Sequence, residues 1–184
     1  MLNIKKTKLK GCYEIQYKRF VDKRGHFQEL YHYKKYSKII KDKFVQDNFS
    51  RSKKNVLRGL HFQLKYPQSK LVSVVKGVIF DVAVDLRVHS KTFGMWHGVR
   101  LSEFNKKQLY IPRKFAHGFL VLSNYAEVLY KCSNYYDRTN EMTLCWNDKD
   151  IKIKWPIRKF KNLILSKKDL LSIDFNTFKN LKKF

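Results

Sequence analysis

Short apolar runs with alternating polar residues dominate the chain, and helical periodicity is weak. This pattern predicts strands at residues 27–33, 44–49, 56–63, 71–76, 78–88, 96–101, 108–112, 117–122 and 126–132. Gly77 separates two of these runs and indicates a tight turn between two strands. Many short strands at fairly regular spacing favour an all-β sandwich or barrel over alternating strands and helices.

Two short helices are expected to interrupt the strands. One is predicted around residues 34–41, and a second is predicted to begin at Ser166, with Asp169 at its third position as the partner in a capping box. The polar, lysine-rich tail from Asn176 is expected to fray. No linker or repeat divides the chain, so residues 1–184 are predicted to form one domain with a sizeable core.

The run VLRGLHFQ at residues 56–63 is unusual among the predicted strands, because polar side chains interrupt its apolar pattern. Simple alternation places Gly59, His61 and Gln63 on one face, so that Arg58 points away from His61. A glycine inside a strand often marks a bulge that re-aims a side chain. If Arg58 and His61 serve one pocket, an irregularity is expected near Gly59.

The net charge of +25, from 40 lysines and arginines against 15 acids, raises the question of nucleic acid. The basic residues are mostly lysines scattered along the chain, which is typical of a solvated surface and not of arginines that read base edges. Nucleic acid is therefore not expected as the main partner. Such a surface would also attract a small anion, for example a nucleotide diphosphate.

Cysteine use and hydropathy bear on the compartment. The three cysteines, Cys12, Cys132 and Cys145, include no CxxC pair, which indicates reduced thiols and a cytoplasmic location. No stretch approaches the length of a membrane span, and the N-terminus lacks the apolar block of a secretory signal, so no membrane partner is expected.

Candidate chemical groups are weak when each is taken alone. Lys70, His117 and Tyr130 each lie in or beside an apolar run, where a structural role explains them equally well. A metal site would need a third ligand beside His61 and His117, and the close pair HxH is absent because position 63 is Gln. No GxSxG element and no GxxxxGK[ST] loop occurs.

Nine runs taken together are more informative than any single residue. In order and spacing, from about residue 12 to residue 170, they resemble the dTDP-4-dehydrorhamnose 3,5-epimerase family. The runs are FVDKRGHFQE (20–29), QDNFSRS (46–52), VLRGLHFQ (56–63), SKLVSVVKG (69–77), DVAVDLRVHSKTFG (81–94), YIPRKFAHGFLVLS (110–123), EVLYKCSNYY (127–136), WNDKDIKIKWP (146–156) and LSKKD (165–169).

This resemblance implies a cupin-like jelly-roll barrel and a cofactor-free isomerase. Its substrate would be a nucleotide-diphosphate-linked 4-keto sugar, inverted at C3, at C5 or at both, for precursors of cell-surface polysaccharide such as lipopolysaccharide or capsule. The resemblance implies no metal, and a homodimer in which an N-terminal strand contributes to the neighbouring subunit. A metal-dependent cupin enzyme and a non-catalytic sugar- or nucleic-acid-binding barrel remain as alternatives.

The resemblance also implies roles for individual residues. His61 would be the general base, Asp169 would orient it, Tyr130 would be the general acid on the opposite face of the sugar, and Lys70 would stand beside the ketone oxygen. Further positions would bind the substrate, namely Arg24, Glu29, Gln46, Asn48, Arg58, His117, Glu141 and Lys168, with Phe20, Phe27 and Tyr136 packing on the nucleotide base. The chain departs from the usual family pattern at Phe49, at Arg113–Lys114 and at Lys149, which leaves the nucleotide and the sugar open.

The implied roles agree with the chemistry of a carbon next to a ketone. Its proton is removable only if the enolate is stabilised, so epimerisation requires a base on one face, an acid on the other and positive charge at the oxygen. Histidine titrates near neutrality and suits the base. Arginine binds phosphate oxygens bidentately and suits the diphosphate.

Overall fold

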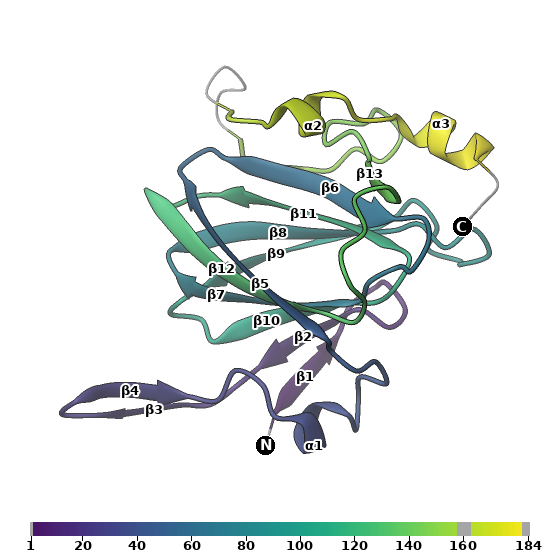
Figure 1. Cartoon of the computed structure of the whole chain (residues 1–184). Helices are drawn as coiled ribbons and strands as arrows, with labels where there is room; N and C mark the ends of the chain where they lie inside the picture. Colours follow the sequence, from purple (N-terminus) through teal and green to yellow (C-terminus); the bar gives the residue numbers. More distant parts are fainter. Residues whose placement is uncertain (1, 158–162, 182–184) are drawn as a thin grey trace.

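Two antiparallel β-sheets packed face to face form the body of the computed structural model, which describes residues 2–157 and 163–181 (Figure 1). One sheet has six strands in the order β1 (Asn3–Lys6), β2 (Tyr13–Gln16), β10 (Lys107–Ile111), β7 (Lys70–Lys76), β12 (Tyr125–Cys132) and β5 (Gln46–Lys53). The other has five, in the order β13 (Glu141–Thr143), β6 (Leu57–Gln63), β11 (Phe115–Val121), β8 (Val78–Asp85) and β9 (Trp96–Ser102). The all-β jelly-roll class expected from the sequence is confirmed.

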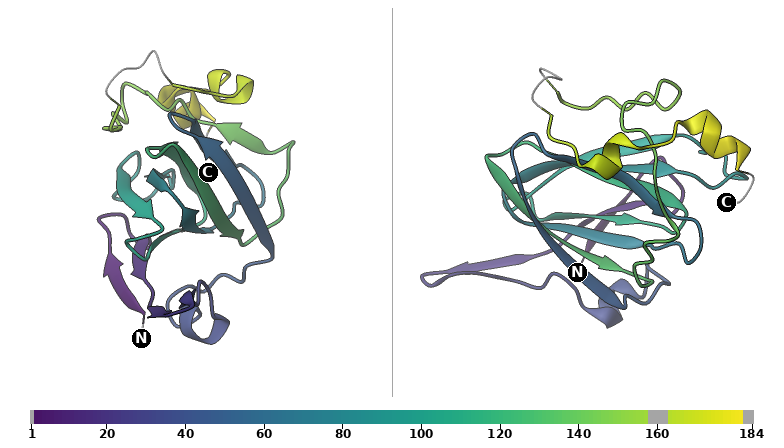
Figure 2. Two further views of the ribbon diagram at one scale, coloured as in Figure 1. Left: turned by 90° about the vertical axis from the view of Figure 1, so that its left-hand side faces the viewer. Right: turned by 45° about the horizontal axis from the view of Figure 1, so that its top comes forward.

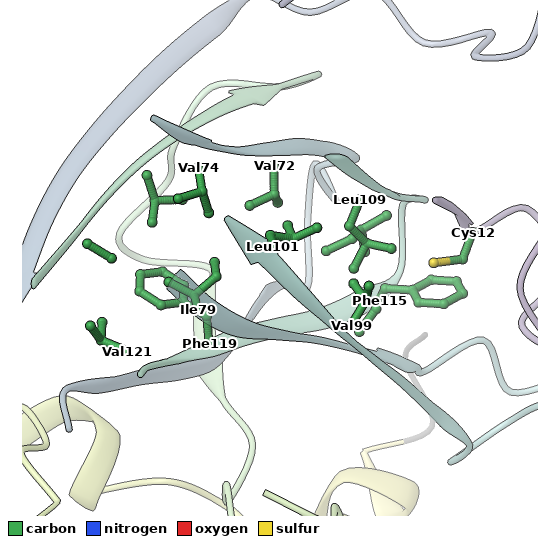
Figure 3. Close-up of a cluster of buried hydrophobic side chains, with 14 of the residues drawn as sticks. Cys12, Val72, Val74, Ile79, Val99, Leu101, Leu109, Phe115, Phe119 and Val121 are labelled. Atoms are coloured by element: carbon green, nitrogen blue, oxygen red, sulfur yellow. The ribbon is translucent and has the colours of Figure 1, made fainter. Parts of the chain in front are cut away.

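The main core lies between the two sheets. Strand alternation turns Val72 and Val74 of β7 toward Ile79 of β8 and Phe119 of β11, and their side chains meet in Figure 3. Each of these side chains is almost fully buried. Removing such apolar surface from water is the main favourable contribution to folding, so this core holds the two sheets together.

The outer faces of the sheets are covered by short helical segments. Helices α2 (Lys167–Leu170) and α3 (Phe175–Asn180) lie over the five-stranded sheet, where Phe175 and Phe178 pack with Leu60 and Phe62 of β6 (Figures 1 and 2). The segment containing α1 (Tyr33–Tyr36) covers part of the six-stranded sheet. Strand β11 is consequently buried along its whole length, which explains its nearly continuous apolar sequence.

Most strands lie within a few residues of their predicted ranges, and the differences have local causes. Four strands of the described residues were missed, namely β1, β2, β3 (Arg19–Asp22) and β13, and each has only three or four residues, too few for alternation to be visible. The strand predicted at 27–33 overlaps only the end of β4 (Gly25–Gln28).

The predicted helices are present, with changed lengths. The helix expected around 34–41 is limited to α1, and the predicted capping box at Ser166 and Asp169 is confirmed at the start of α2. Helix α3 occupies much of the tail that the sequence predicts to fray, because Phe175 and Phe178 are buried in the outer core. Residues 182–184 of that tail lie outside the described residues.

Gly77 forms the predicted tight connection between two strands, and these strands belong to different sheets. Strand β7 on its N-terminal side belongs to the six-stranded sheet, and β8 on its C-terminal side belongs to the five-stranded sheet. Gly77 has φ of +81°, and a Cβ there would lie 2.2 Å from the carbonyl oxygen of Tyr125. Only glycine allows the chain to cross between the sheets so close to this backbone.

A hairpin formed by β3 and β4 projects from the two-sheet body (Figures 1 and 2). Its apolar side chains lie in solvent, with Phe20 60%, Val21 74% and Phe27 69% exposed. An isolated two-stranded hairpin is marginally stable in water, and one that exposes phenylalanines is a candidate for contact with another surface.

Candidate active site

Strand β6 contains the irregularity that the sequence predicts near Gly59. His61 is opposite His117 of β11, whereas Arg58 is opposite Phe119, so β6 has one more residue than β11 between these pairs. Gly59 has φ of +107°, and a Cβ there would lie 2.5 Å from the carbonyl oxygen of His117. The extra residue shifts the alternation by one position, so that Arg58 and His61 point to the same side of the sheet.

A cavity of about 190 Å³ is enclosed by residues of both sheets. It brings together His61 of β6, Lys70 of β7 and Tyr130 of β12, three of the residues that the sequence marks for chemistry. Its other predicted members are Gln46, Asn48, Tyr136 and Glu141. The cavity is also lined by residues that were not predicted as site residues, among them Gln63, Pro67, Gln68 and Lys114. Groups up to 95 residues apart in the chain therefore share one cavity.

His61 is oriented by Asp169, as the sequence predicts. Nε2 of His61 donates to Oδ1 of Asp169 over 2.6 Å, which leaves Nδ1 as the nitrogen able to take a proton. Asp169 itself is held by the N–H of Gly59 and by the hydroxyl of Ser166, so the capping box of α2 also fixes the partner of the histidine.

The ionisation of this pair suits a general base. Burial lowers the pKa of His61 below its ordinary value of 6.5, and the hydrogen bond with Asp169 acts in the opposite direction. Burial raises the pKa of Asp169, but the hydrogen bonds from His61 and Ser166 outweigh it and bring the pKa to about 2. At neutral pH the pair is thus a neutral imidazole beside a carboxylate, ready to accept a proton.

Tyr130 and Lys70 have shifted pKa values of opposite sign. Burial, followed by the neighbouring Cys132, raises the pKa of Tyr130, while Arg58 opposes the rise, so the phenol keeps its proton at neutral pH. Burial lowers the pKa of Lys70, while Cys132, Glu141 and Asp81 act against the decrease. The cavity therefore holds a proton acceptor, a proton donor and an amine.

At the mouth of the cavity, several of the predicted binding residues are joined by hydrogen bonds. Oε2 of Glu141 accepts a hydrogen bond of 2.6 Å from the hydroxyl of Tyr136 and forms an ion pair with Lys168 of α2. Burial raises the pKa of Glu141, but Lys168 and Tyr136 outweigh it and lower the pKa overall. Gln46 accepts from the backbone N–H of Tyr136 and donates to Asn48, so β5 and the mouth are linked.

His117 and Arg58 lie beside the cavity and do not line it. His117 is 5% exposed, and its Nε2 lies 2.8 Å from Oδ1 of Asp81 on β8. Nε of Arg58 donates to the hydroxyl of Ser52 over 3.0 Å. Asp81 was not singled out from the sequence, although an acid in the middle of the apolar run VIFDVAV was a usable signal.

Four predicted binding residues are not brought to the cavity of their own chain. Phe20, Arg24 and Phe27 belong to the projecting β3–β4 hairpin, and Arg24 pairs with Asp22 of the same hairpin over 2.6 Å. Glu29 follows the hairpin and pairs with Lys35. None of the four lines the cavity.

His61 and His117 do meet across neighbouring strands, the arrangement that raised the question of a metal. Each has its Nε2 engaged by an aspartate, Asp169 and Asp81 respectively. Within residues 2–157 and 163–181, no three His, Cys, Asp or Glu side chains are grouped to hold a metal ion. No helix in this part of the chain is long and apolar enough to cross a membrane.

The proteins compared below, which are similar to this chain in sequence or in fold, are named epimerases. The family model described as dTDP-4-dehydrorhamnose 3,5-epimerase matches residues 6–177. The dTDP-4-dehydrorhamnose 3,5-epimerase of Shigella flexneri is 49% identical over 172 residues, covering 92% of this chain and 93% of the relative. A dTDP-4-dehydrorhamnose 3-epimerase of Streptomyces niveus is 36% identical over 151 residues, covering 80% of this chain and 73% of the relative. The crystal structure of dTDP-6-deoxy-D-glucose-3,5-epimerase from Legionella pneumophila Philadelphia 1, in complex with dTDP-4-keto-L-rhamnose, superposes with a TM-score of 0.90 at 47% identity and covers 94% of this chain and 92% of that one.

Proposed function

The chain belongs to the dTDP-4-dehydrorhamnose 3,5-epimerase family, and we propose that it inverts both C3 and C5 of a dTDP-linked 4-keto-6-deoxy sugar. It is an isomerase that acts on a nucleotide-linked 4-keto sugar, for the synthesis of cell-surface polysaccharide precursors. The observation that carries the proposed epimerisation is the meeting of His61, Lys70 and Tyr130 in one cavity, with Asp169 bound to the histidine.

In the proposed reaction, Nδ1 of His61 takes the proton from the carbon next to the ketone. The electron pair of the C–H bond forms a C=C bond with the carbonyl carbon, and the π pair of the C=O bond moves to the ketone oxygen, which becomes an enolate. The ammonium group of Lys70 stabilises this charge, the kind of electrostatic contribution that is often the largest in enzymes. Asp169 holds the imidazole in its reactive tautomer and stabilises the imidazolium that forms.

Tyr130 then donates a proton to the opposite face of the same carbon, which inverts it. Its raised pKa keeps the phenol protonated until the enolate is present. The imidazolium and the phenolate return to their starting states by exchange with solvent, so each inverted carbon acquires a solvent proton. The C3 and C5 positions both flank the ketone at C4, and one set of groups serves both in sequence.

The choice of dTDP and of double inversion rests on the relatives. The Shigella flexneri protein, named a 3,5-epimerase, is 49% identical, whereas the Streptomyces niveus protein, named a 3-epimerase, is 36% identical. The Legionella pneumophila protein was crystallised with dTDP-4-keto-L-rhamnose. At the mouth, Lys168 and Tyr136 supply a cation for the diphosphate and a ring for the base.

The test is incubation with dTDP-4-keto-6-deoxy-glucose in deuterated water, followed by NMR. We expect deuterium at both C3 and C5 and the signals of the inverted sugar. Deuterium at C3 alone would refute double inversion, and its absence from both carbons would refute the epimerase proposal. The GDP-linked sugar, tested in parallel, is expected to react poorly, and equal rates would contradict the assignment of dTDP.

We further propose a homodimer in which the β3–β4 hairpin reaches the cavity of the second copy. The hairpin carries Phe20, Arg24 and Phe27, which match ligand positions of the family, yet they project from the body of their own chain (Figure 1). Docking on a partner would cover the exposed phenylalanines and bring Arg24 to a diphosphate. A monomer in sedimentation at micromolar concentration would contradict this arrangement.

The proposed compartment is the cytoplasm. Cys12, Cys132 and Cys145 are all free thiols, and this state agrees with a reducing compartment.

A further inference from the structure

Two buried acids on β8, Asp81 and Asp85, are both 0% exposed but differ in their hydrogen bonding. Asp85 accepts hydrogen bonds from the backbone and guanidinium of Arg87 and from the hydroxyls of Ser90 and Thr92. Asp81 has one hydrogen bond, from Nε2 of His117, and its Oδ2 has no partner among the described residues.

The hydrogen bonding indicates a structural role for Asp85 and no comparable structural role for Asp81. The bonds to Asp85 fix the loop after β8, and they compensate the cost of burying its charge. Asp81 lies among the apolar side chains of the main core with one hydrogen bond, to His117, and with the charge of Lys70 near enough to affect it, so its partners among the described residues belong to the site and not to a loop of the fold. Buried polar groups that break local rules in this way are typical of functional sites.

The position of His117 connects Asp81 to the reaction. His117 is directly opposite His61 on the neighbouring strand, so both side chains stand on one side of the sheet. The centroid of its ring lies 6.5 Å from that of Tyr130. His117 therefore stands next to both the proposed base and the proposed acid.

We propose that Asp81 is a positioning residue, which holds His117 in the Nε2–H tautomer and leaves Nδ1 as its only atom for contact with the sugar. This inference rests on the proposed epimerase function and on His117 as a binding residue. In neutral imidazole the second nitrogen accepts a hydrogen bond, which suits a hydroxyl group of the sugar ring. Asp81 and His117 thus form a second histidine–aspartate pair beside that of His61 and Asp169, with a role in binding and not in proton transfer.

The first experiment measures steady-state kinetics of Asp81→Asn with the dTDP-linked sugar. An asparagine amide can donate to Nε2 and move the ring proton to Nδ1, which would remove the acceptor facing the sugar. We expect KM to rise roughly tenfold, the effect of about one lost hydrogen bond, with a smaller change in kcat. The matched control is Asp85→Asn, which should lower the melting temperature and leave KM unchanged.

A double-mutant cycle separates this role from general damage to the fold. If Asp81 acts through His117, adding Asp81→Asn to His117→Gln should change KM no further, because the two effects are coupled. Additive effects would overturn the proposal, as would an unchanged KM in Asp81→Asn.

The second experiment needs no variant at Asp81, so it decides even if Asp81→Asn does not fold. ¹⁵N NMR of the imidazole nitrogens, assigned with His117→Gln, should show a protonated Nε2 in the wild-type protein. A deprotonated Nε2 with a proton only on Nδ1 would overturn the proposal. Deuterium incorporation by the wild-type protein tests the proposed function separately. A failure of the epimerase proposal can therefore be distinguished from a failure of the role proposed for Asp81.

Discussion

The cavity and the β3–β4 hairpin both carry residues that match ligand positions of the family, but the structure holds them differently. In the cavity, His61 is bonded to Asp169, and Glu141 is bonded to Tyr136, each over 2.6 Å. On the hairpin, Phe20 and Phe27 are 60% and 69% exposed, and Arg24 pairs only with its neighbour Asp22. The resemblance to a family thus predicts which residues bind a ligand, but it does not predict whether the proposed dimer brings them to a cavity of the same chain or of its partner.

The largest effect is expected for the cavity. His61→Asn should lower the rate of deuterium incorporation at C3 and C5 by roughly 10²–10⁴-fold, because no other group replaces the base. The matched control is His97→Asn, since His97 is also paired with an acid, Glu14 at 3.2 Å, but lies outside the cavity. Incorporation by His61→Asn within tenfold of wild type would remove His61 from the role of base.

A somewhat smaller effect is expected when the charge near the ketone oxygen is removed. Lys70→Met should lower kcat by roughly 10²–10³-fold, the usual loss when one stabilising donor is deleted. Its melting temperature should not fall, because replacing a buried cation by an apolar side chain of similar length relieves desolvation. If the melting temperature of Lys70→Met falls together with its activity, Lys70 has a structural role and the proposed role beside the ketone oxygen is wrong. Lys107→Met, which breaks the ion pair with Glu14, serves as control and should keep full activity.

The hairpin is expected to affect binding more than chemistry. Arg24→Ala should raise KM about tenfold with little change in kcat, since a diphosphate contact is lost while His61 and Tyr130 are intact. Lys23→Ala, next to it in the same hairpin, is the control and should behave as wild type.

Mixing two variants sharpens this comparison. Refolding Arg24→Ala together with His61→Asn should produce mixed dimers that contain one site with a normal cavity and a normal hairpin. We expect such mixtures to regain a low KM. A hairpin that serves its own chain predicts no such recovery, so unchanged KM in the mixture would contradict the exchange between copies.

The smallest expected effect is a shift of the acid limb of the kcat/KM profile to lower pH than an ordinary histidine would give. The proposed base acts as neutral imidazole, and burial lowers the pKa of His61 below 6.5. The kcat/KM should therefore stay constant as the pH falls through 6.5 and decrease only at lower pH. Asp169→Asn removes a group that raises this pKa, so its acid limb should move further down. An acid limb above 6.5 in the wild-type enzyme would contradict the assignment.

The sequence was a good guide to whatever is local or repeated along the chain. Alternation located the long strands, and the capping pattern located Ser166 and Asp169 at the start of α2. It also placed an irregularity at Gly59, since a strand with Arg58 and His61 on one side needs an extra residue. The family resemblance supplied the cavity residues, whose meeting depends on sheet pairings that no local pattern reveals.

The features that the sequence did not predict depend on which strands become neighbours in space. Gly77 predicted a tight connection between two strands, but strand propensity does not reveal that these strands belong to different sheets. Asp81 interrupts an apolar run, which was a usable signal, but its partner His117 is on another strand, and no local pattern places the two side by side. The projection of the hairpin could not be seen in its own residues, because β3 and β4 have four residues each, too few for alternation to be visible. Only the family resemblance implied an N-terminal strand that reaches a neighbouring subunit.

Asp169 belongs to a capping box close to the C-terminal end of the described chain, yet it serves a histidine more than a hundred residues earlier. The proposed base therefore has its partner only while α2 is docked on β6. Loosening of α2 would separate His61 from the carboxylate that raises its pKa, and it would do so without any change in the residues that line the cavity. The docking of a four-residue helix is thus a point at which the strength of the base could be altered from outside the cavity.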